Sequence, residues 1–128
     1  MSFGFVKDNY LSFASNESNL TSEQIEKMIA LADFATASCV RTPGALMVVI
    51  DAVDGATSST QNRVVVTERL RNINDLLIQI GFTRSEVFGK RTSLTALNER
   101  VSAGGNSTGQ LLTSDIVAVQ LVCQRRPK

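Results

Sequence analysis

Histidine is absent from this chain of 128 residues, and its absence narrows the possible functions most. Histidine is the commonest general base and a common ligand of zinc and copper. Without it, the usual Ser-His-Asp and Cys-His catalytic arrangements are excluded. An enzyme would need an acid-only mechanism built on Asp51 and Asp54, and two acids at a strand end lack the oxygen ligands that calcium requires. We therefore expect a protein that is not an enzyme and that holds no cofactor and no metal.

An excess of charge of one sign is also missing. The chain has 13 Lys and Arg against 12 Asp and Glu, a net charge of +1, whereas a general nucleic-acid binder shows a stronger basic excess. Nucleic acid is therefore not an expected partner, and the basic residues 125–128 are interpreted as a solvated chain end. No apolar run approaches the ~18 residues of a membrane span, so we expect contact with a membrane only through a segment outside this chain.

The first residues, MSFGFVKDNYL, lack the charged start, apolar core and small-residue cleavage site of a signal peptide. The chain is thus expected to be either a cytosolic protein or a domain whose export signal lies upstream. Its length, with 43% hydrophobic and 20% charged residues, fits one folded domain spanning residues 1–128.

Cysteine is scarce. Cys39 and Cys123 are the two in the chain, and their separation matches no zinc or redox motif. They could pair in an oxidising compartment, or they could be two small buried apolar residues. The second interpretation is slightly preferred.

The first part of the chain carries a complete helix start signal. After a short strand at 10–13 and a polar loop at 14–20, Thr21 can cap a helix and Gln24 stands at the capping-box spacing. Leu20 and Ile25 are placed for a hydrophobic staple. The predicted helix runs from Ser22 to about Ser38. Its apolar face comprises Ile25, Met28, Ile29, Ala32 and Ala35.

The segment from Leu46 to Gly81 dominates the remaining pattern. Leu46–Val53 is apolar without alternation, which predicts a central strand covered on both faces. Asp51 and Asp54 are expected at or past the carboxyl end of this strand, and residues 55–61 have the composition of a loop.

A second helix is predicted to start near Asn62 and to end at Gly81, with Phe82 packing back as in a Schellman motif. At about 100° per residue, Arg69 lies about 60° from the centre of the apolar stripe, on the same edge as Asn62. Glu68, Arg71 and Asp75 point into solvent on the same projection. The apolar stripe itself comprises Val66, Leu70, Ile73, Leu77 and Ile80.

The rest of the chain completes an α/β pattern. Residues 84–92 predict a strand, 93–101 are ambiguous and could form a short helix, 102–109 predict a loop, and 115–124 predict a last strand covered on both faces. The order β-α-β-α-β-β indicates an α/β sandwich with the helices packed on one mixed sheet. The strands on either side of the second helix should be parallel.

A candidate binding site lies at the end of the central strand. In open α/β sheets ligands tend to bind beyond the carboxyl ends of strands, where Asp54, Asn62 and Arg69 are expected. An acid and an arginine facing one pocket can recognise a zwitterion, because the acid accepts from an ammonium group and the arginine donates to a carboxylate. Alternatively, Arg69 and Asp54 simply pair and tie the loop to the helix, and local pattern alone favours that interpretation.

The same three residues resemble a family signature. The spacing of Asp54, Asn62 and Arg69 is similar to the motif T-D-x-x-G-S-x-x-x-N-x-x-L-S-x-x-R-A of the OmpA C-terminal-like domains, which include the peptidoglycan-associated lipoprotein and flagellar MotB. The segment YLSFASNESNLTSEQIEKM resembles the first strand and the helix start of that family, and Ile80-Gly81-Phe82 resembles the end of its second helix. The likeness covers most of residues 8–92.

The sequence also departs from the motif. Val53 replaces the threonine that precedes the motif aspartate. Thr57 occupies the position of the motif glycine, and Leu70 replaces the alanine that follows the motif arginine. The arginine-rich start of the last strand is replaced by residues 113–115, Thr-Ser-Asp.

The resemblance implies a function. It implies a non-catalytic module of the bacterial periplasm that is anchored by an upstream segment outside this chain. Such a module would bind the diaminopimelate of peptidoglycan with Asp54 and Arg69. The resemblance also assigns Asn62 to this binding site. Other envelope or secretion-system proteins are further expected partners. The alternative is an OmpA-like fold that serves only as a protein–protein assembly unit of a secretion or conjugation system. Val53 and residues 64–66, all valine, favour the alternative because they predict a more apolar rim.

Overall fold

Seven elements make up the computed structural model, which describes residues 5–54, 60–93, 96–97, 99 and 115–126. In chain order they are β1 (Phe5–Ser12), α1 (Ser22–Ser38), β2 (Leu46–Asp54), α2 (Thr60–Gln79), the 3-10 turn η1 (Arg84–Glu86), β3 (Val87–Ser93) and β4 (Ile116–Cys123). The predicted order β-α-β-α-β-β is therefore confirmed. None of the helices in the described ranges is both long and apolar enough to cross a membrane.

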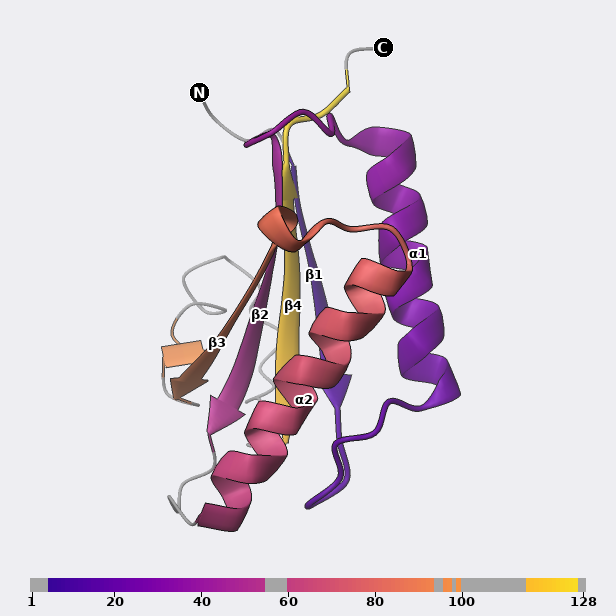
Figure 1. Cartoon of the computed structure of the whole chain (residues 1–128). Helices are drawn as coiled ribbons and strands as arrows, with labels where there is room; N and C mark the ends of the chain where they lie inside the picture. Colours follow the sequence, from indigo (N-terminus) through magenta and orange to yellow (C-terminus); the bar gives the residue numbers. More distant parts are fainter. Residues whose placement is uncertain (1–4, 55–59, 94–95, 98, 100–114, 127–128) are drawn as a thin grey trace.

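The four strands form one mixed sheet in the order β1-β4-β2-β3. β2 and β3 are parallel, as predicted for strands on either side of a crossover helix, while β4 is antiparallel to both β1 and β2. Both helices cover the same face of this sheet (Figure 1). The predicted fold class, an α/β sandwich with helices on one mixed sheet, is thus confirmed.

α1 has the predicted bounds and the predicted start. Gln24 N donates to Thr21 Oγ1 at 3.2 Å, and Thr21 N donates to Gln24 Oε1 at 2.8 Å, which completes the capping box. The predicted buried face is wrong at Ile29, which is 42% exposed, and Leu31 is buried in its place. Gln24 explains the difference, because its Nε2 also donates to the carbonyl of Ser12. The side of α1 that carries Gln24 and Leu31 therefore faces the sheet.

α2 begins at Thr60, two residues before the predicted start, and it ends as predicted. Gly81 has a φ of +127°, its N–H donates to Ile78 O, and Phe82 N donates to Leu77 O, which are the two hydrogen bonds of a Schellman motif. Three stripe residues are fully buried and the other two are partly buried. The buried ones are Val66, Ile73 and Leu77.

The strands differ from the prediction mainly in length. β1 starts at Phe5 and not at Tyr10, because its polar residues pair with β4 along the whole register from Phe5↔Cys123 to Ser12↔Ile116. The predicted position of Asp51 at or past the strand end is wrong. β2 continues to Asp54, and Asp51 is fully buried inside the sheet, with Lys90 Nζ of the neighbouring strand 3.6 Å from its Oδ1.

The last strand and the segment before it fit the prediction where the structure describes them. β4 is buried on both faces at most positions, as expected for a covered central strand. Ala96 and Leu97, within the ambiguous stretch 93–101, are helical. The predicted loop at 102–109 lies outside the described residues. Residues 84–86 form a 3-10 turn and not the start of a strand.

Cys39 and Cys123 form a disulfide, so the preferred interpretation of two unpaired buried cysteines is wrong. Cys39 follows α1 and Cys123 ends β4, and the backbone joins the same two segments through Val40 N, which donates to Gln124 O at 2.8 Å. Both cysteines are fully buried. Burial alone was therefore a correct expectation, but it does not distinguish paired from unpaired thiols.

Reduction of the disulfide should destabilise the protein. The bond joins residues 84 positions apart, and in the chain-entropy account the closing of such a loop raises the free energy of the unfolded chain by about 4.6 kcal/mol. We expect the free energy of unfolding, measured in urea, to be lower by that order when a thiol reductant is present. The double variant Cys39→Ser with Cys123→Ser should be insensitive to the reductant. Equal stability of oxidised and reduced wild-type protein would contradict this expectation.

Candidate functional site

The predicted site residues lie at one end of the sheet. The strand pairing makes β1, β2 and β3 run in one direction and β4 in the other, so the carboxyl ends of the first three meet the start of β4. The amino ends of α1 and α2 lie at this same end, the lower one in Figure 1. Asp54 is the last residue of β2, and Asn62 belongs to the first turn of α2. The backbone therefore places both residues at the end that was predicted.

Arg69 projects from α2 and is almost completely buried, with 2% of its surface exposed. Its Nε donates to Glu17 O at 2.7 Å, and its Nη2 donates to Ala14 O and to Asp115 Oδ1, both at 3.2 Å. The guanidinium also lies over the ring of Phe13, 4.8 Å from its centre. One side chain thus connects α2, the segment after β1 and the residue before β4.

The backbone of the β1–α1 segment is shaped to present these carbonyls. Asn16 adopts a left-handed conformation, with φ of 64°, which asparagine tolerates better than most residues. Glu17 N donates to Ala14 O at 3.0 Å and closes the turn. From α2, Asn72 Nδ2 donates to Ser18 O at 2.8 Å, so the helix holds the segment at a second point.

Asp115 is absent from the predicted site, yet it forms the ion pair of Arg69. Its carboxylate is 40% exposed, whereas the arginine is buried. A signal for it exists in the sequence, because Asp115 is the first residue of the predicted last strand, and the start of that strand meets the carboxyl end of β1. Antiparallel pairing of those strands was needed to place it beside Arg69.

The predicted alternative, a pair between Arg69 and Asp54, stays a prediction. It depends on the side chain of Asp54, and the side chains of Asp54 and Asn62 lie outside the described part of the structure. Arg69 was expected at the edge of the buried face, and it is in fact fully buried. The reason is the β1–α1 segment, which covers this side of α2.

The chemistry of this end is that of charge recognition. Guanidinium N–H groups donate in a fixed planar geometry that suits carboxylates. Among the residues that the structure describes, no group of three or more His, Cys, Asp or Glu could hold a metal ion. Asp51, the other half of the acid-only hypothesis, is fully buried in the sheet.

Comparison with solved structures identifies the fold. The OmpA-like domain of FopA1 from Francisella tularensis matches 94% of this chain and 75% of its own length, with 14% identity and a TM-score of 0.61. The periplasmic domain of Helicobacter pylori MotB matches 91% of this chain and 75% of its own length, with 12% identity and a TM-score of 0.59. A MotB-like protein from Desulfovibrio vulgaris matches 94% of this chain and 76% of its own length, with 13% identity and a TM-score of 0.55.

The chain has the fold of the OmpA C-terminal-like domains. No protein-family model and no functionally curated protein matches the sequence. At these identities the structural likeness establishes the OmpA-like fold alone, so ligand and partners have to be argued from the site.

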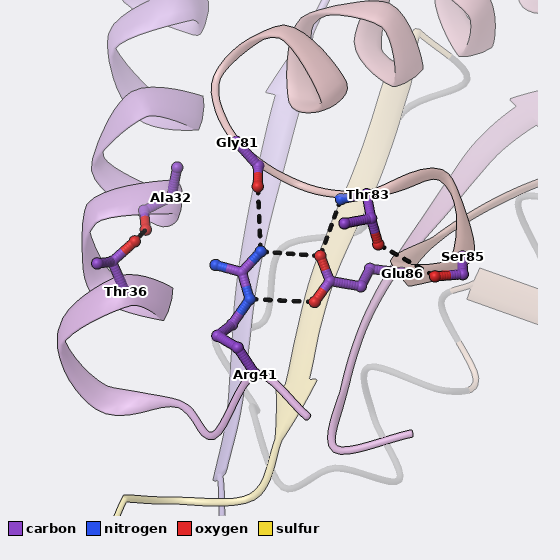
Figure 2. Close-up of polar contacts among 7 residues, drawn as sticks. All are labelled: Ala32, Thr36, Arg41, Gly81, Thr83, Ser85 and Glu86. Atoms are coloured by element: carbon purple, nitrogen blue, oxygen red, sulfur yellow. Dashed lines mark hydrogen bonds and ion pairs between the residues drawn. The ribbon is translucent and has the colours of Figure 1, made fainter. Parts of the chain in front are cut away.

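A second polar cluster lies at the opposite end of this OmpA-like fold. In Figure 2 the guanidinium of Arg41 faces the carboxylate of Glu86 as a fork, with Nε to Oε2 at 3.0 Å and Nη2 to Oε1 at 2.8 Å. Arg41 Nη2 also donates to Gly81 O at 3.1 Å, and Thr83 N donates to Glu86 Oε1 at 2.9 Å. The cluster fastens the segment after α1 to the end of α2 and the start of β3.

This cluster shifts the titration of Glu86. Burial by itself raises the pKa of the Glu86 carboxyl, but the hydrogen bonds from Arg41, the backbone N–H of Thr83 and the charge of Arg41 together outweigh it. The pKa therefore lies below its usual value of 4.5. Because these partners bind the ionised carboxylate, they stabilise the folded chain when Glu86 is charged.

Removal of the Arg69 side chain should destabilise the protein strongly. Arg69→Ala removes the donor described for Glu17 O and leaves Ala14 O with the N–H of Glu17 alone, and a hydrogen bond from a charged group contributes about 1.5–3 kcal/mol. Arg71 lies on the same helix and is exposed, so Arg71→Ala should change the free energy of unfolding by less than about 0.5 kcal/mol. Urea denaturation of both variants is the measurement. Equal stability of the two would show that Arg69 does not fasten the fold.

Glu86→Gln should alter the pH dependence of stability. The folded pKa is depressed, so the contribution of ionised Glu86 is present above about pH 4.5 and is lost as the pH falls through the folded pKa. We expect wild type to be more stable than Glu86→Gln at pH 7, with a difference that shrinks as the pH falls below 4.5. Urea midpoints between pH 7 and pH 3 test this. A difference that stays constant over that range would contradict the assignment.

Proposed function

We propose that this chain is a non-catalytic module of the bacterial cell envelope that binds peptidoglycan through the diaminopimelate of its stem peptide. Arg69 binds the carboxylate of the free amino acid end, Asp54 binds the ammonium group, and Asn62 belongs to the same site. The observation that carries the proposal is the position of the Arg69 guanidinium. It is a charged group buried at the sheet end where β2 stops and α2 starts.

The chemistry of the ligand matches that of the site. The free amino acid end of diaminopimelate is a zwitterion, and a charge-assisted hydrogen bond forms at each of its groups. The amino end of α2 lies at this same end of the sheet, where its first N–H groups carry a partial positive charge. Recognition of this kind makes and breaks no covalent bond, so it needs neither the missing histidine nor a cofactor.

We place this function in the periplasm. The Helicobacter pylori MotB domain with the same fold is described as periplasmic. The Cys39–Cys123 disulfide supports the same compartment, because disulfides form and persist in the bacterial periplasm and are rare in the cytosol. Other envelope proteins are the further partners that such a module would have.

A second candidate function is an OmpA-like unit for protein–protein assembly in a secretion or conjugation system. The low exposure of Arg69 favours it, since its described hydrogen bonds all go to groups of the chain itself. The apolar rim supports it less than expected. Val64 is 50% exposed, but Val53, Val65 and Val66 are buried and take no part in a surface.

Peptidoglycan binding can be tested by sedimentation with purified sacculi. Asp54→Asn removes the charge that binds the ammonium group, and Arg69→Lys keeps the positive charge but loses the planar fork. We expect each variant to bind at least about tenfold more weakly than wild type, the effect of losing one charge-assisted hydrogen bond. Arg71→Ala and Asp75→Asn change exposed charges of the same helix and should bind like wild type.

The outcomes separate the two functions. Full sedimentation of folded Asp54→Asn and Arg69→Lys would show that the proposed pocket is wrong. Failure of wild type to sediment, together with envelope proteins that co-purify with it, would support the assembly unit.

A further inference from the structure

We propose that Asp115 is an internal competitor for the ligand: it occupies the anion position on Arg69 that a ligand carboxylate must take. The inference rests on the proposed function and adds how the site is controlled. Ligand binding then becomes an exchange of one carboxylate for another on the same guanidinium. A ligand that lacks a free carboxylate is excluded from the site, because it cannot replace Asp115 on Arg69.

The three acceptors that the described part of the structure gives to Arg69 differ in kind. Ala14 O and Glu17 O are neutral backbone groups, and the turn between them is closed by its own hydrogen bond. Asp115 Oδ1 is the charged acceptor, at 3.2 Å from Nη2. A cation buried in a protein needs a counter-charge, so this is the acceptor that a second anion can replace.

Exposure shows where the exchange can occur. The Arg69 side chain is 2% exposed, so a ligand reaches it only where one of its covering groups moves. The Asp115 side chain is 40% exposed and borders solvent. Asp115 is therefore the partner whose departure opens a path to the guanidinium.

The backbone of Asp115 allows its side chain to leave without disturbing the sheet. Asp115 O accepts a hydrogen bond from Phe13 N at 2.8 Å, directly next to the β1–β4 ladder that starts at Ser12↔Ile116. Rotation of the side chain into solvent leaves this bond in place. The change needed for binding is thus a rotamer change of one surface side chain.

The competition has an energetic consequence. While Asp115 holds Arg69, only a fraction of the molecules can accept a ligand, and the apparent dissociation constant rises by the inverse of that fraction. Removal of the Asp115 charge should therefore tighten binding. It should also destabilise the unliganded protein, because the buried guanidinium loses its counter-charge.

The test uses Asp115→Asn, which keeps the shape and an oxygen acceptor but loses the charge. Meso-diaminopimelate is the probe, and its dissociation constant is measured by isothermal titration calorimetry or by NMR titration. We expect Asp115→Asn to bind about tenfold more tightly than wild type, as for release from one charge-assisted hydrogen bond. Its unliganded melting temperature should be lower than that of wild type, and its melting temperature should rise more on addition of the ligand.

Two controls isolate the position of the charge. Asp75→Asn removes an exposed carboxylate elsewhere on the protein and should bind diaminopimelate like wild type. 1,5-Diaminopentane has the two amines of diaminopimelate and no carboxylate, so Asp115→Asn should not improve its binding.

The possible results are distinct for the two proposals. If wild type binds diaminopimelate and folded Asp115→Asn binds it equally or more weakly, the competition is overturned and the proposed function stands. If neither protein binds at millimolar ligand, both proposals fail. Tighter binding by Asp115→Asn to diaminopimelate, but not to diaminopentane, supports the exchange.

Discussion

A buried positive charge is the constraint on which one end of this fold depends. Arg69 lies in the interior with 2% exposure, and a guanidinium in that position has to be surrounded by acceptors. The carbonyls of Ala14 and Glu17 and the carboxylate of Asp115 supply them. The β1–α1 segment and the start of β4 are therefore held in place by hydrogen bonds from one side chain of α2, that of Arg69. Asn72 adds a second attachment to the same segment.

Local signals predicted the parts of the fold that local physics determines. The capping box of Thr21 and Gln24 and the Schellman end at Gly81 and Phe82 depend on residues within one helical turn, and both are present. The prediction that Ile29 is buried was wrong because helical spacing gives the width of an apolar stripe but not the rotation of the helix about its axis. That rotation depends on a hydrogen bond between Gln24 and Ser12, which belongs to another element.

Other misses have the same origin in distant contacts. Asp51 was predicted at a strand end because a buried carboxylate in a central strand is costly. Its contact with Lys90 comes from the neighbouring strand β3, which the local pattern does not show. Arg69 was placed on the correct edge of its helix by angle alone. Its partners are 46 to 55 residues away in the sequence, so neither its depth nor the role of Asp115 could be read from the pattern around it.

The direction of β1 has a mechanical consequence for a tethering module. β1 begins at the end of the sheet opposite the amino ends of α1 and α2 (Figure 1). Its eight residues pair with β4 along their whole length, and its last residue, Ser12, pairs with Ile116, next to the Asp115 that Arg69 contacts. A pulling force between the start of β1 and a ligand held at Arg69 would run parallel to the strands. Under such a shearing load the hydrogen bonds of the ladder resist together, whereas a force across the strands would open them one after another. In a module that binds its ligand at Arg69, the edge strand would therefore transmit tension along the sheet.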